Sequence, residues 1–296
     1  MAMTMQTAAA GQLEDALDLL ESAFPEHSVD VGGSMVSYRT CGRESSSESG
    51  AGRSVVLLHG IGSGAASWLQ CALKLQQDTR VIAWNAPGYG NSSPLPITHP
   101  SAADYASRLQ QFLQTLGLKN YVLVGHSLGA MMASAHVAAV HGGAAQLLLI
   151  SPAQGYGSDD KRMRGQEIAQ QRLDVLDKLG VDGMALKSPE RMLSAQAGEP
   201  ARAWVRWNTQ KLNPAGYAQA VHMLCGDDIQ RYVPAGLSAA VYCGAADIVT
   251  TPQDSRALAD SFKLPFQLID DAGHACYVEQ PEAVAAVIRH HLYQLS

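Results

Sequence analysis

The sequence predicts an α/β fold in which helices cover both faces of a mostly parallel sheet. From Ser54 onward, short apolar runs alternate with helical segments. Such alternation is typical of parallel sheets, because a connection between parallel strands must cross one face of the sheet and usually does so as a helix. A second observation, a long interval without strands, predicts an insertion into this sheet.

Six apolar runs supply the predicted strands. Each run is short, rich in leucine or β-branched residues, and free of the polar alternation that marks a strand with one face in solvent. The runs are 54–59, 80–84, 121–124, 146–150, 239–243 and 265–269. Helices are expected between or after them, near 65–77, 101–117, 128–142, 252–262 and 281–293.

Residues 1–53 precede these strands and are expected to add a helix, a hairpin and a loop. Apolar residues recur at helical spacing over 13–24, which predicts a short amphipathic helix. Alternating apolar residues on both sides of Gly32 and Gly33 predict a β-hairpin. The serine- and glycine-rich stretch 44–53 is expected to form a mobile loop.

The stretch 152–234 interrupts the alternation of strands and helices. It contains no clear strand but several helical patterns, including 165–178 and 190–212. Long structureless loops are uncommon in compact domains, so we interpret this stretch as a helical insertion over the edge of the sheet. The predicted core is then formed by 54–151 and 235–296 together.

Composition narrows the class of protein. Of 296 residues, 47% are hydrophobic and 16% are charged, which is ordinary for a globular protein. A net charge of -6 argues against a nucleic-acid partner. No apolar run reaches roughly 18 residues, so no membrane span is predicted.

Residues 1–24 contain no lysine or arginine and hence no secretory n-region, so a cytoplasmic location is expected. The five scattered cysteines form no Cys-x-x-Cys pair and are expected to be reduced.

The clearest chemical motif is Gly125-His126-Ser127-Leu128-Gly129, between a predicted strand and a predicted helix. A G-x-S-x-G motif in this setting is typical of a nucleophile elbow, a sharp turn that exposes the serine hydroxyl. Small residues two positions before and after the serine relieve the crowding of the turn. The helix that follows points its amides toward developing negative charge. We therefore predict Ser127 as a nucleophile.

A serine nucleophile needs a base, and the base needs an orienting group. With this elbow the acid precedes the histidine along the chain. His274 follows the last predicted strand, and Asp247 follows the strand before it. We predict His274 as the base and Asp247 as the acid. The rival carboxylates of Asp270 and Asp271 precede His274 too closely to fold back onto its ring.

Two backbone amides are needed to bind the oxyanion that serine attack produces. The amide of Leu128, directly after the nucleophile, is one candidate. The amide of Ile61 is the other, because its glycine-rich loop after the first core strand lets the backbone approach closely. His59 at the start of this loop is expected to fix the loop by hydrogen bonding.

A dinucleotide-binding site is the main rival interpretation of this loop. Gly60, Gly62 and Ala65 match the spacing of the phosphate-binding fingerprint. That fingerprint requires an acidic residue at the end of the next strand to hold the ribose, and Trp84 and Asn85 stand there. We therefore predict no bound cofactor.

Metal-ligating patterns are equally weak. Histidines that share a helix face are usually four positions apart. The pairs present are His290 with His291, His136 with His141, and His222 with Cys225, none of which has this spacing or further ligands. No metal site is predicted.

Taken together, these motifs resemble the α/β-hydrolase fold superfamily. The residues that carry the resemblance are His59-Gly60, the segment 86–92, Gly125 to Gly129, Asp247, and Gly273-His274 followed by Glu279-Gln280-Pro281. The resemblance implies an eight-stranded, mostly parallel sheet and a helical lid at 152–234, inserted after the sixth strand. It also implies a catalytic triad of Ser127, Asp247 and His274.

The chain departs from the family pattern at Asn85, where relatives usually carry aspartate; we expect a local adjustment of the turn there. The resemblance favours hydrolysis of a small carboxylic ester or lactone through an acyl-enzyme. Trp68, at the end of the glycine-rich loop, is also similar to hydrolases that cleave carbon–carbon bonds in ring-fission diketones. Those relatives commonly carry tryptophan directly after the catalytic histidine, where this chain has Ala275. A non-catalytic ligand receptor on the same fold is a third alternative.

The expected partner is a small-molecule substrate, and nothing in the sequence predicts an oligomeric state. The insertion offers side chains that could face the substrate or simply pack against the sheet. The large ones are Trp204, Trp207, Tyr217, His222, Met223 and Tyr232. Basic residues of the insertion could hold a substrate carboxylate, although a solvated helix face is the simpler explanation. Those considered are Lys161, Arg162, Arg164, Arg202 and Arg206.

Overall fold

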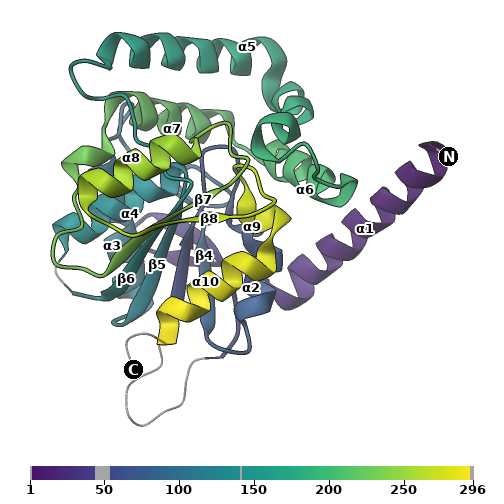
Figure 1. Ribbon diagram of the computed structural model, residues 1–296, viewed down its shortest axis with the longest axis horizontal. Coiled ribbons are helices and arrows are strands. Elements are labelled where there is room, and N and C mark those ends of the chain that lie inside the picture. Colours follow the sequence, from purple (N-terminus) through teal and green to yellow (C-terminus); the bar gives the residue numbers. More distant parts are fainter. Residues whose placement is uncertain (1, 44–53, 141, 294–296) are drawn as a thin grey trace.

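The computed structural model describes residues 2–43, 54–140 and 142–293 (Figure 1). Its centre is an eight-stranded sheet in the order β1-β2-β4-β3-β5-β6-β7-β8. The strands are β1 (Glu26–Asp30), β2 (Met35–Cys41), β3 (Ser54–Leu58), β4 (Arg80–Trp84), β5 (Tyr121–His126), β6 (Ala144–Ile150), β7 (Ala239–Gly244) and β8 (Phe266–Ile269). The expected loop at 44–53 lies outside the described residues.

Strand pairing confirms the prediction of a mostly parallel sheet. The hairpin of β1 and β2 turns through Gly32 and Gly33, whose φ angles are 61° and 84°, a region that glycine adopts at little cost. β2 pairs antiparallel with both β1 and β4, whereas every later pair is parallel. Because β3 to β8 run in one direction, their carboxyl ends meet at one edge of the sheet, where ligands bind in open α/β sheets.

Helices cover both faces of this sheet. They are α1 (Ala2–Ala23), α2 (Leu69–Leu75), α3 (Ala102–Thr115), α4 (Leu128–Ala139), α8 (Pro252–Phe262), α9 (Cys276–Glu279) and α10 (Pro281–Tyr293), with the 3-10 helices η1 (Ala65–Trp68) and η2 (Ile229–Arg231). α1 is longer than the predicted helix at 13–24, because the preceding stretch is rich in alanine, methionine and glutamine, which favour helix even without apolar periodicity.

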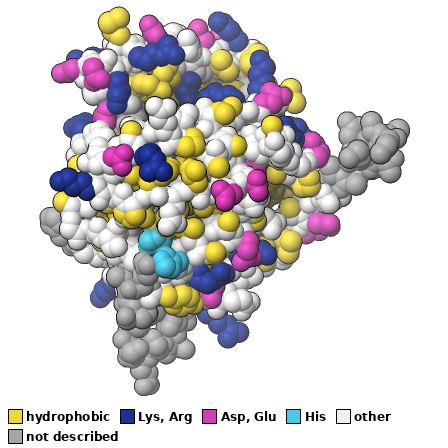
Figure 2. Space-filling view, viewed as in Figure 1, with side chains coloured by type: hydrophobic (Ala, Val, Ile, Leu, Met, Phe, Trp, Pro, Cys, Tyr) yellow, Lys and Arg dark blue, Asp and Glu magenta, His cyan; other side chains and the backbone are white. Residues whose placement is uncertain are grey.

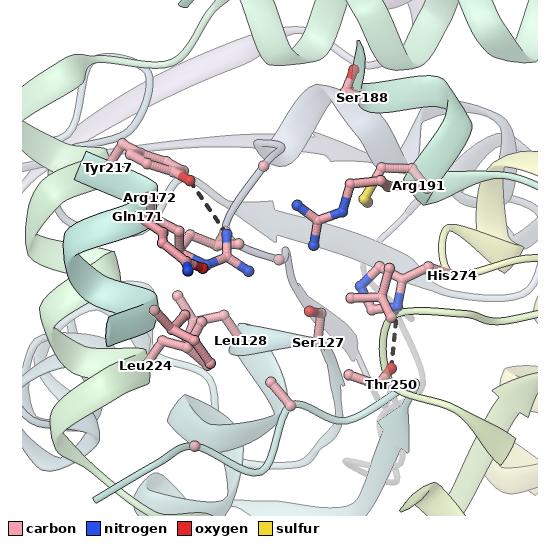
Figure 3. Close-up of a pocket in the computed structure, with 18 of the residues that line it drawn as sticks. Ser127, Leu128, Gln171, Arg172, Ser188, Arg191, Tyr217, Leu224, Thr250 and His274 are labelled. Carbon is pink, nitrogen blue, oxygen red and sulfur yellow. Dashed lines mark hydrogen bonds between the residues drawn. The ribbon is translucent and has the colours of Figure 1, made fainter. Parts of the chain in front are cut away.

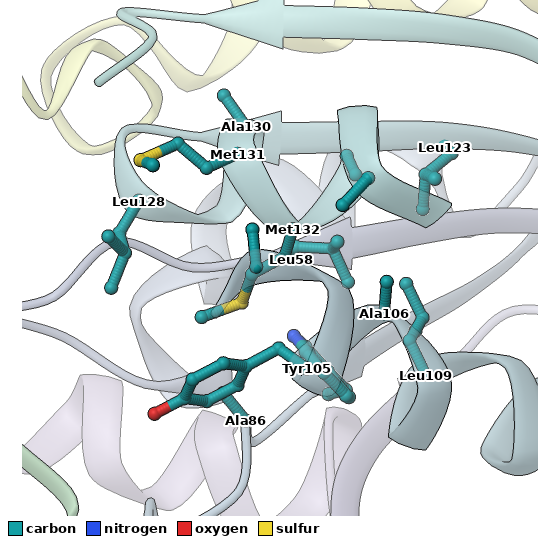
Figure 4. Close-up of a cluster of buried hydrophobic side chains, with 14 of the residues drawn as sticks. Leu58, Ala86, Tyr105, Ala106, Leu109, Leu123, Leu128, Ala130, Met131 and Met132 are labelled. Atoms are coloured by element: carbon teal, nitrogen blue, oxygen red, sulfur yellow. The ribbon is translucent and has the colours of Figure 1, made fainter. Parts of the chain in front are cut away.

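The core is divided between the two faces of the sheet. Val56 and Leu58 of β3 belong to one buried cluster, which also contains residues of α3, α4 and α8. Val55 and Leu57 belong to the other, with residues of α2 and α10. Figure 4 shows part of the first cluster, in which Leu58 and Leu123 of the sheet lie beside side chains of α3 and α4. Burial on both faces explains why the strands carry uninterrupted apolar runs.

The predicted helical insertion after the sixth strand is also confirmed. It contains α5 (Arg162–Met192), α6 (Glu199–Gln210) and α7 (Pro214–Gly226), and α5 crosses the top of the molecule in Figure 1. α5 bends at Gly180, where φ is 62° and ψ is -178°. The helical pattern at 190–212 is split in two, because Leu193 and Ser194 leave the helix to contact the loop around His274.

α7 packs against the core through a backbone contact. A Cβ atom added at Gly216 would overlap the carbonyl of Gly88, and one added at Gly88 would lie 2.6 Å from the Cα of Gly216. Only glycine at both positions permits this approach. Within residues 2–43, 54–140 and 142–293, no helix has the combined length and apolar character needed to cross a membrane.

Candidate active site

Ser127 lies in a strained turn between β5 and α4. Its φ angle is 53°, in the left-handed region that non-glycine residues rarely adopt. The turn is held by the amide of Ser127, which donates to Ile150 O at 3.0 Å, and by its carbonyl, which accepts from the amide of Ala153 at 3.1 Å. Strain of this kind persists only where the surroundings fix it, and it is concentrated at functional sites.

The two glycines of the motif permit this turn. A Cβ atom at Gly125 would lie 2.5 Å from the carbonyl oxygen of Gly129, and a Cβ atom at Gly129 would lie 2.6 Å from that of Leu58. Both distances are shorter than real Cβ contacts. The spacing G-x-S-x-G is therefore explained by close packing of α4 against β5 and the end of β3.

His274 and Asp247 are joined by a hydrogen bond. The Nδ1 atom of His274 lies 2.9 Å from Oδ2 of Asp247, and both side chains are buried. Asp247 also accepts from the amides of Val249 at 2.7 Å and Thr250 at 3.1 Å. Burial opposes ionisation of this carboxyl, but the hydrogen bonds from His274 and Val249 outweigh it and hold the pKa of Asp247 well below its ordinary value. The carboxylate is therefore charged at neutral pH.

The two rival carboxylates do not reach the histidine. Asp270 and Asp271 are both exposed, and neither hydrogen-bonds His274 within the described chain. The structure thus brings together His274 and Asp247, as the order along the chain predicts.

Two neighbours of this pair were not singled out from the sequence. The hydroxyl of Thr250 lies 2.9 Å from Oδ2 of Asp247 and 3.1 Å from Nδ1 of His274. Nε2 of His126 donates to the carbonyl of His274 at 2.9 Å. Burial and the neighbouring His274 lower the pKa of His126 to about 3, so its ring is neutral at pH 7 and acts as a hydrogen-bond donor. Local sequence gives no signal for the contacts of Thr250 and His126 with His274, because each joins segments far apart in the chain.

Glu279 ties the loop of His274 to the insertion. Its carboxylate accepts from the amide of Gly273 at 2.7 Å and from the amide and hydroxyl of Ser194, the latter at 2.6 Å. On the other side of the histidine, the amide of Ala275 donates to Met192 O at 2.7 Å. The end of α5 is thus bonded on both sides of His274.

A cavity of about 740 Å³ opens beside these residues. Ser127 and His274 both line it, and Figure 3 shows their side chains at its floor. Ile61 and Leu128 line it as well, together with residues of α5 and α7. Four of the five predicted site residues therefore share one cavity, and Asp247 lies behind His274.

The backbone near Ser127 offers two amide groups without an acceptor among the described residues, those of Ile61 and Leu128. Gly60 lets the loop approach, since a Cβ atom there would lie 3.0 Å from Cβ of Ser127. The hydroxyl of Tyr89 donates to Ile61 O at 2.9 Å, which orients that peptide.

His59 fixes this loop, as the sequence predicts. Its Nδ1 donates to Gly60 O at 2.8 Å and its Nε2 accepts from the amide of Ala86 at 3.0 Å. Burial lowers the pKa of His59 to about 4, so the ring is neutral and can serve both bonds.

Comparison with known proteins fits this geometry. A model of the alpha/beta hydrolase family matches residues 55–287. The chain belongs to this family. The match spans most of the chain, the insertion included, and confirms the resemblance inferred from the motifs.

Several solved structures share the fold of this chain. The chain is similar to a thermophilic esterase from Thermogutta terrifontis, with a TM-score of 0.76 and 24% identity over 90% of this chain and 97% of that one. It is also similar to the enol-lactonase from Burkholderia xenovorans LB400, with a TM-score of 0.78 and 21% identity over 90% of this chain and 99% of that one. At these identities the likeness establishes the fold alone.

Among curated sequences, the chain is similar to RutD of Escherichia coli O103:H2 (strain 12009 / EHEC), a provisionally named carbamate hydrolase. The two are 36% identical over 78 residues, which is 26% of this chain and 29% of RutD. The aligned stretch spans less than a third of that relative's length.

The family departure at Asn85 has a structural reason. Its Oδ1 accepts from the amide of Ala65 at 2.9 Å, while its Nδ2 donates to Ser37 Oγ at 2.9 Å and to Oε1 of Glu26 at 3.1 Å. An aspartate has no N–H to donate and would repel the carboxylate of Glu26. The local adjustment expected here is thus an added hydrogen bond to β1.

Most of the large side chains of the insertion that could face the substrate do not line the cavity. Of the six large side chains considered, Tyr217 alone lines it. Trp204 is buried and stacks on Trp207 with ring centroids 5.1 Å apart. Trp68, a basis for the carbon–carbon alternative, likewise stacks on Tyr277 at 4.0 Å outside the cavity.

Of the five basic residues considered, Lys161 and Arg164 line the cavity, and the other three do not. Two further arginines, Arg172 and Arg191, also line it and were missed from the sequence. In the part of the chain that the structure describes, no group of three or more His, Cys, Asp or Glu side chains is arranged to hold a metal ion.

Proposed function

We propose that the protein is a serine hydrolase that cleaves a small carboxylic ester or lactone through an acyl-enzyme. The observation that carries this proposal is that Ser127, in its strained turn, and His274, bonded to Asp247, line the same cavity. The three residues come from three loops at the carboxyl ends of β5, β7 and β8, which is where the chemistry of such sheets is placed.

The proton transfers follow from the tautomer of His274. Since Nδ1 donates to the ionised Asp247, Nε2 is free to accept the proton of the Ser127 hydroxyl. The serine oxygen then attacks the carbonyl carbon, and the imidazolium returns this proton to the departing alcohol. A water molecule attacks the resulting acyl-enzyme, with His274 again accepting and then donating the proton. Ser127 is restored and the acid is released.

Stabilisation of the oxyanion is assigned to the amides of Ile61 and Leu128. Both lack an acceptor among the described residues, and both residues line the cavity beside Ser127. The Leu128 amide also stands at the N-terminus of α4, where the helix dipole favours negative charge. Two such donors typically contribute several kcal/mol to transition-state binding, about 3 kcal/mol each.

The choice of an ester or lactone is supported by two relatives of the same fold, a protein described as an esterase and another described as an enol-lactonase. In this proposal the core, residues 54–151 and 235–296, carries the chemistry. The insertion, residues 152–234, acts as the lid that selects the substrate, because α5 and α7 supply much of the cavity wall.

Replacement of Ser127 tests the proposal. Wild-type protein should hydrolyse 4-nitrophenyl acetate and be labelled stoichiometrically by a fluorophosphonate, and Ser127→Ala should lose both properties. Ser134→Ala is the matched control, since Ser134 lies on α4, is buried and is absent from the cavity wall. Full hydrolysis by Ser127→Ala would refute the proposal.

Two alternatives have distinct outcomes in the same experiment. A carbon–carbon hydrolase would cleave a ring-fission diketone far faster than any ester in a parallel screen. A ligand receptor would bind small molecules tightly without turnover and without Ser127-dependent release of product.

A further inference from the structure

The cavity above Ser127 is basic although the chain is acidic. The chain as a whole has a formal net charge of -6. The basic side chains that line the cavity are Lys161, Arg164, Arg172, Lys187 and Arg191, whereas Asp254 is the one Asp or Glu among the described residues that do so. Figure 2 shows Lys and Arg side chains, dark blue, over the insertion at the top of the view. Positive charge is thus concentrated where the substrate of the proposed hydrolase would lie.

Two of these cations are neutralised by the protein itself. Nζ of Lys161 lies 3.2 Å from Oδ2 of Asp228, and Nη1 of Arg164 lies 2.9 Å from Oε2 of Glu167. Three basic residues of the insertion that do not line the cavity are also satisfied within the protein: Arg162 by Asp159, Arg206 by Glu199, and Arg202 by the carbonyl of Ala197.

The remaining cations of the wall are Lys187, Arg172 and Arg191, and of these the two arginines have the planar forks that suit a carboxylate. Nη1 of Arg172 donates to the hydroxyl of Tyr217 at 3.3 Å, and no described carboxylate pairs with it. The side chain of Arg191 makes no hydrogen bond or ion pair with any residue that the structure describes. A guanidinium has five N–H donors in a planar fork, so each residue retains most of its capacity to bind an anion.

The two guanidinium groups face one another across the cavity. Figure 3 shows them pointing toward each other, with Ser127 and His274 below. Burial and the charge of Arg172 both lower the pKa of Arg191 below its ordinary value, which places the two cations within electrostatic reach. Two like charges that face one another repel, and a bound anion between them would turn this repulsion into attraction.

The rest of the wall is largely apolar. Ile61, Leu128, Ile168 and Leu224 line it together with the arginines. Such a wall suits a hydrocarbon chain or ring. A pair of arginines suits a planar carboxylate, which can accept two parallel hydrogen bonds from one fork and a further hydrogen bond from the other.

We propose that Arg172 and Arg191 bind a carboxylate of the substrate, so that the protein acts on esters or lactones that carry a carboxylate away from the bond to be cleaved. This inference rests on the proposed hydrolase function for its reaction. The anion site itself rests on the two arginines alone, so the two can be tested separately.

A matched pair of substrates tests the preference. Mono-4-nitrophenyl adipate and 4-nitrophenyl hexanoate have acyl chains of equal carbon number, and only the first ends in a carboxylate. With spontaneous hydrolysis subtracted, wild-type kcat/KM should be higher for the adipate ester by about 10-fold or more, the effect expected of a charge-assisted hydrogen bond. Arg172→Gln and Arg191→Gln should each reduce the adipate-to-hexanoate ratio by about 10- to 100-fold.

Arg162→Gln is the control for net charge. It removes the same charge from α5, but Arg162 does not line the cavity and pairs with Asp159 on the surface. Exposed charges are screened by salt, so the ratio should change by no more than about twofold. A wild-type ratio near one, or arginine variants that keep the wild-type ratio, would refute the carboxylate site and leave the hydrolase proposal intact.

Calorimetry with Ser127→Ala tests the site without turnover. Adipate should bind to this variant, and adding Arg191→Gln should weaken the binding by about 10-fold or more. Arginine-dependent binding of adipate together with an inert wild-type protein would refute the hydrolase and support the site. Hexyl phosphate binding about 10-fold more tightly than hexanoate would identify a phosphate site and refute the carboxylate assignment.

Discussion

The carboxylate of Glu279 accepts a 2.7 Å hydrogen bond from the amide of Gly273, the residue directly before His274. The same carboxylate accepts two further hydrogen bonds from Ser194, in the segment between α5 and α6. One half-buried carboxylate therefore holds both the loop of the proposed base and the segment between α5 and α6. This side chain thus links the position of His274 to the position of the insertion.

Glu279→Gln should lower both activity and stability. A glutamine has one acceptor oxygen, and its NH2 group would face N–H donors, so at least one of the three bonds is lost. We expect kcat for 4-nitrophenyl acetate to fall by about 10-fold and the free energy of unfolding to fall by about 1–3 kcal/mol. Stopped assays and urea unfolding measure the two effects.

Glu282→Gln is the control for this variant. Glu282 is exposed and forms surface ion pairs with Lys74 and Arg289, which contribute little to stability. If Glu279→Gln matched the wild type in kcat while Glu282→Gln did not, the assigned role of Glu279 would be wrong.

Asp247→Asn should lose most turnover while remaining folded. The asparagine can no longer hold His274 in the required tautomer or stabilise its charged form, and a fall of about 10³-fold or more is expected. Asp270→Asn is the matched control, because Asp270 is an exposed carboxylate directly after the last core strand. Near-normal kcat in Asp247→Asn, or a comparable loss in Asp270→Asn, would place the acid elsewhere.

The pH dependence of stability provides a second measurement on Asp247. Its pKa in the folded protein lies below the ordinary 3.8, so the ionised carboxylate stabilises the fold above that pH and this contribution is lost as pH falls through the folded pKa. The stability difference between wild type and Asp247→Asn should therefore be largest at neutral pH and shrink below about pH 4. Urea unfolding at several pH values gives this difference directly, and a gap that widens in acid would contradict the charged state.

Gly60→Ala should impair catalysis by steric contact. The new methyl group would lie 3.0 Å from Cβ of Ser127 and 3.1 Å from Nδ1 of His126. We expect the loop that carries Ile61 to shift and kcat to fall by about 10-fold or more. Gly226→Ala is the control, since nothing lies within 4 Å of a Cβ atom at that position. Equal kcat values for both variants would show that this approach of the loop is unimportant.

Thiol titration should find one reactive cysteine in the folded protein. Cys41, Cys71, Cys243 and Cys276 are buried, and burial raises the pKa of Cys41 and of Cys243 to about 12. Cys225 is half-buried, and burial raises its pKa as well, so a disulfide reagent at pH 8 should modify Cys225 slowly in the native state and all five cysteines after unfolding. Rapid modification of Cys276 with loss of activity would contradict its burial.

Much of the fold could be predicted because buried strands have a local signature. β3 and β7 are uninterrupted apolar runs, since neighbours cover both of their faces. Ser127 was recognisable for a similar reason: the glycines that its turn requires lie two positions away on each side. Asp247 and His274 followed from their places after the last two core strands.

The wall of the cavity could not be predicted in this way. Arg172 and Arg191 lie 19 positions apart in one predominantly polar helix, and the sequence alone gave them no distinction from Arg162. Which basic side chains find a carboxylate depends on tertiary contacts such as that of Lys161 with Asp228. The contacts of Asn85 with Ser37, Ala65 and Glu26 are equally non-local.

Gly180 has a consequence for the range of molecules that this cavity could admit. Arg172 precedes it in α5 and Arg191 follows it, and its φ of 62° with ψ of -178° is a conformation almost exclusive to glycine. The span between the two guanidinium groups therefore depends on the torsion angles of this residue. Evolution or a protein engineer could change the preferred length of a ligand at this one position, without altering the reacting groups.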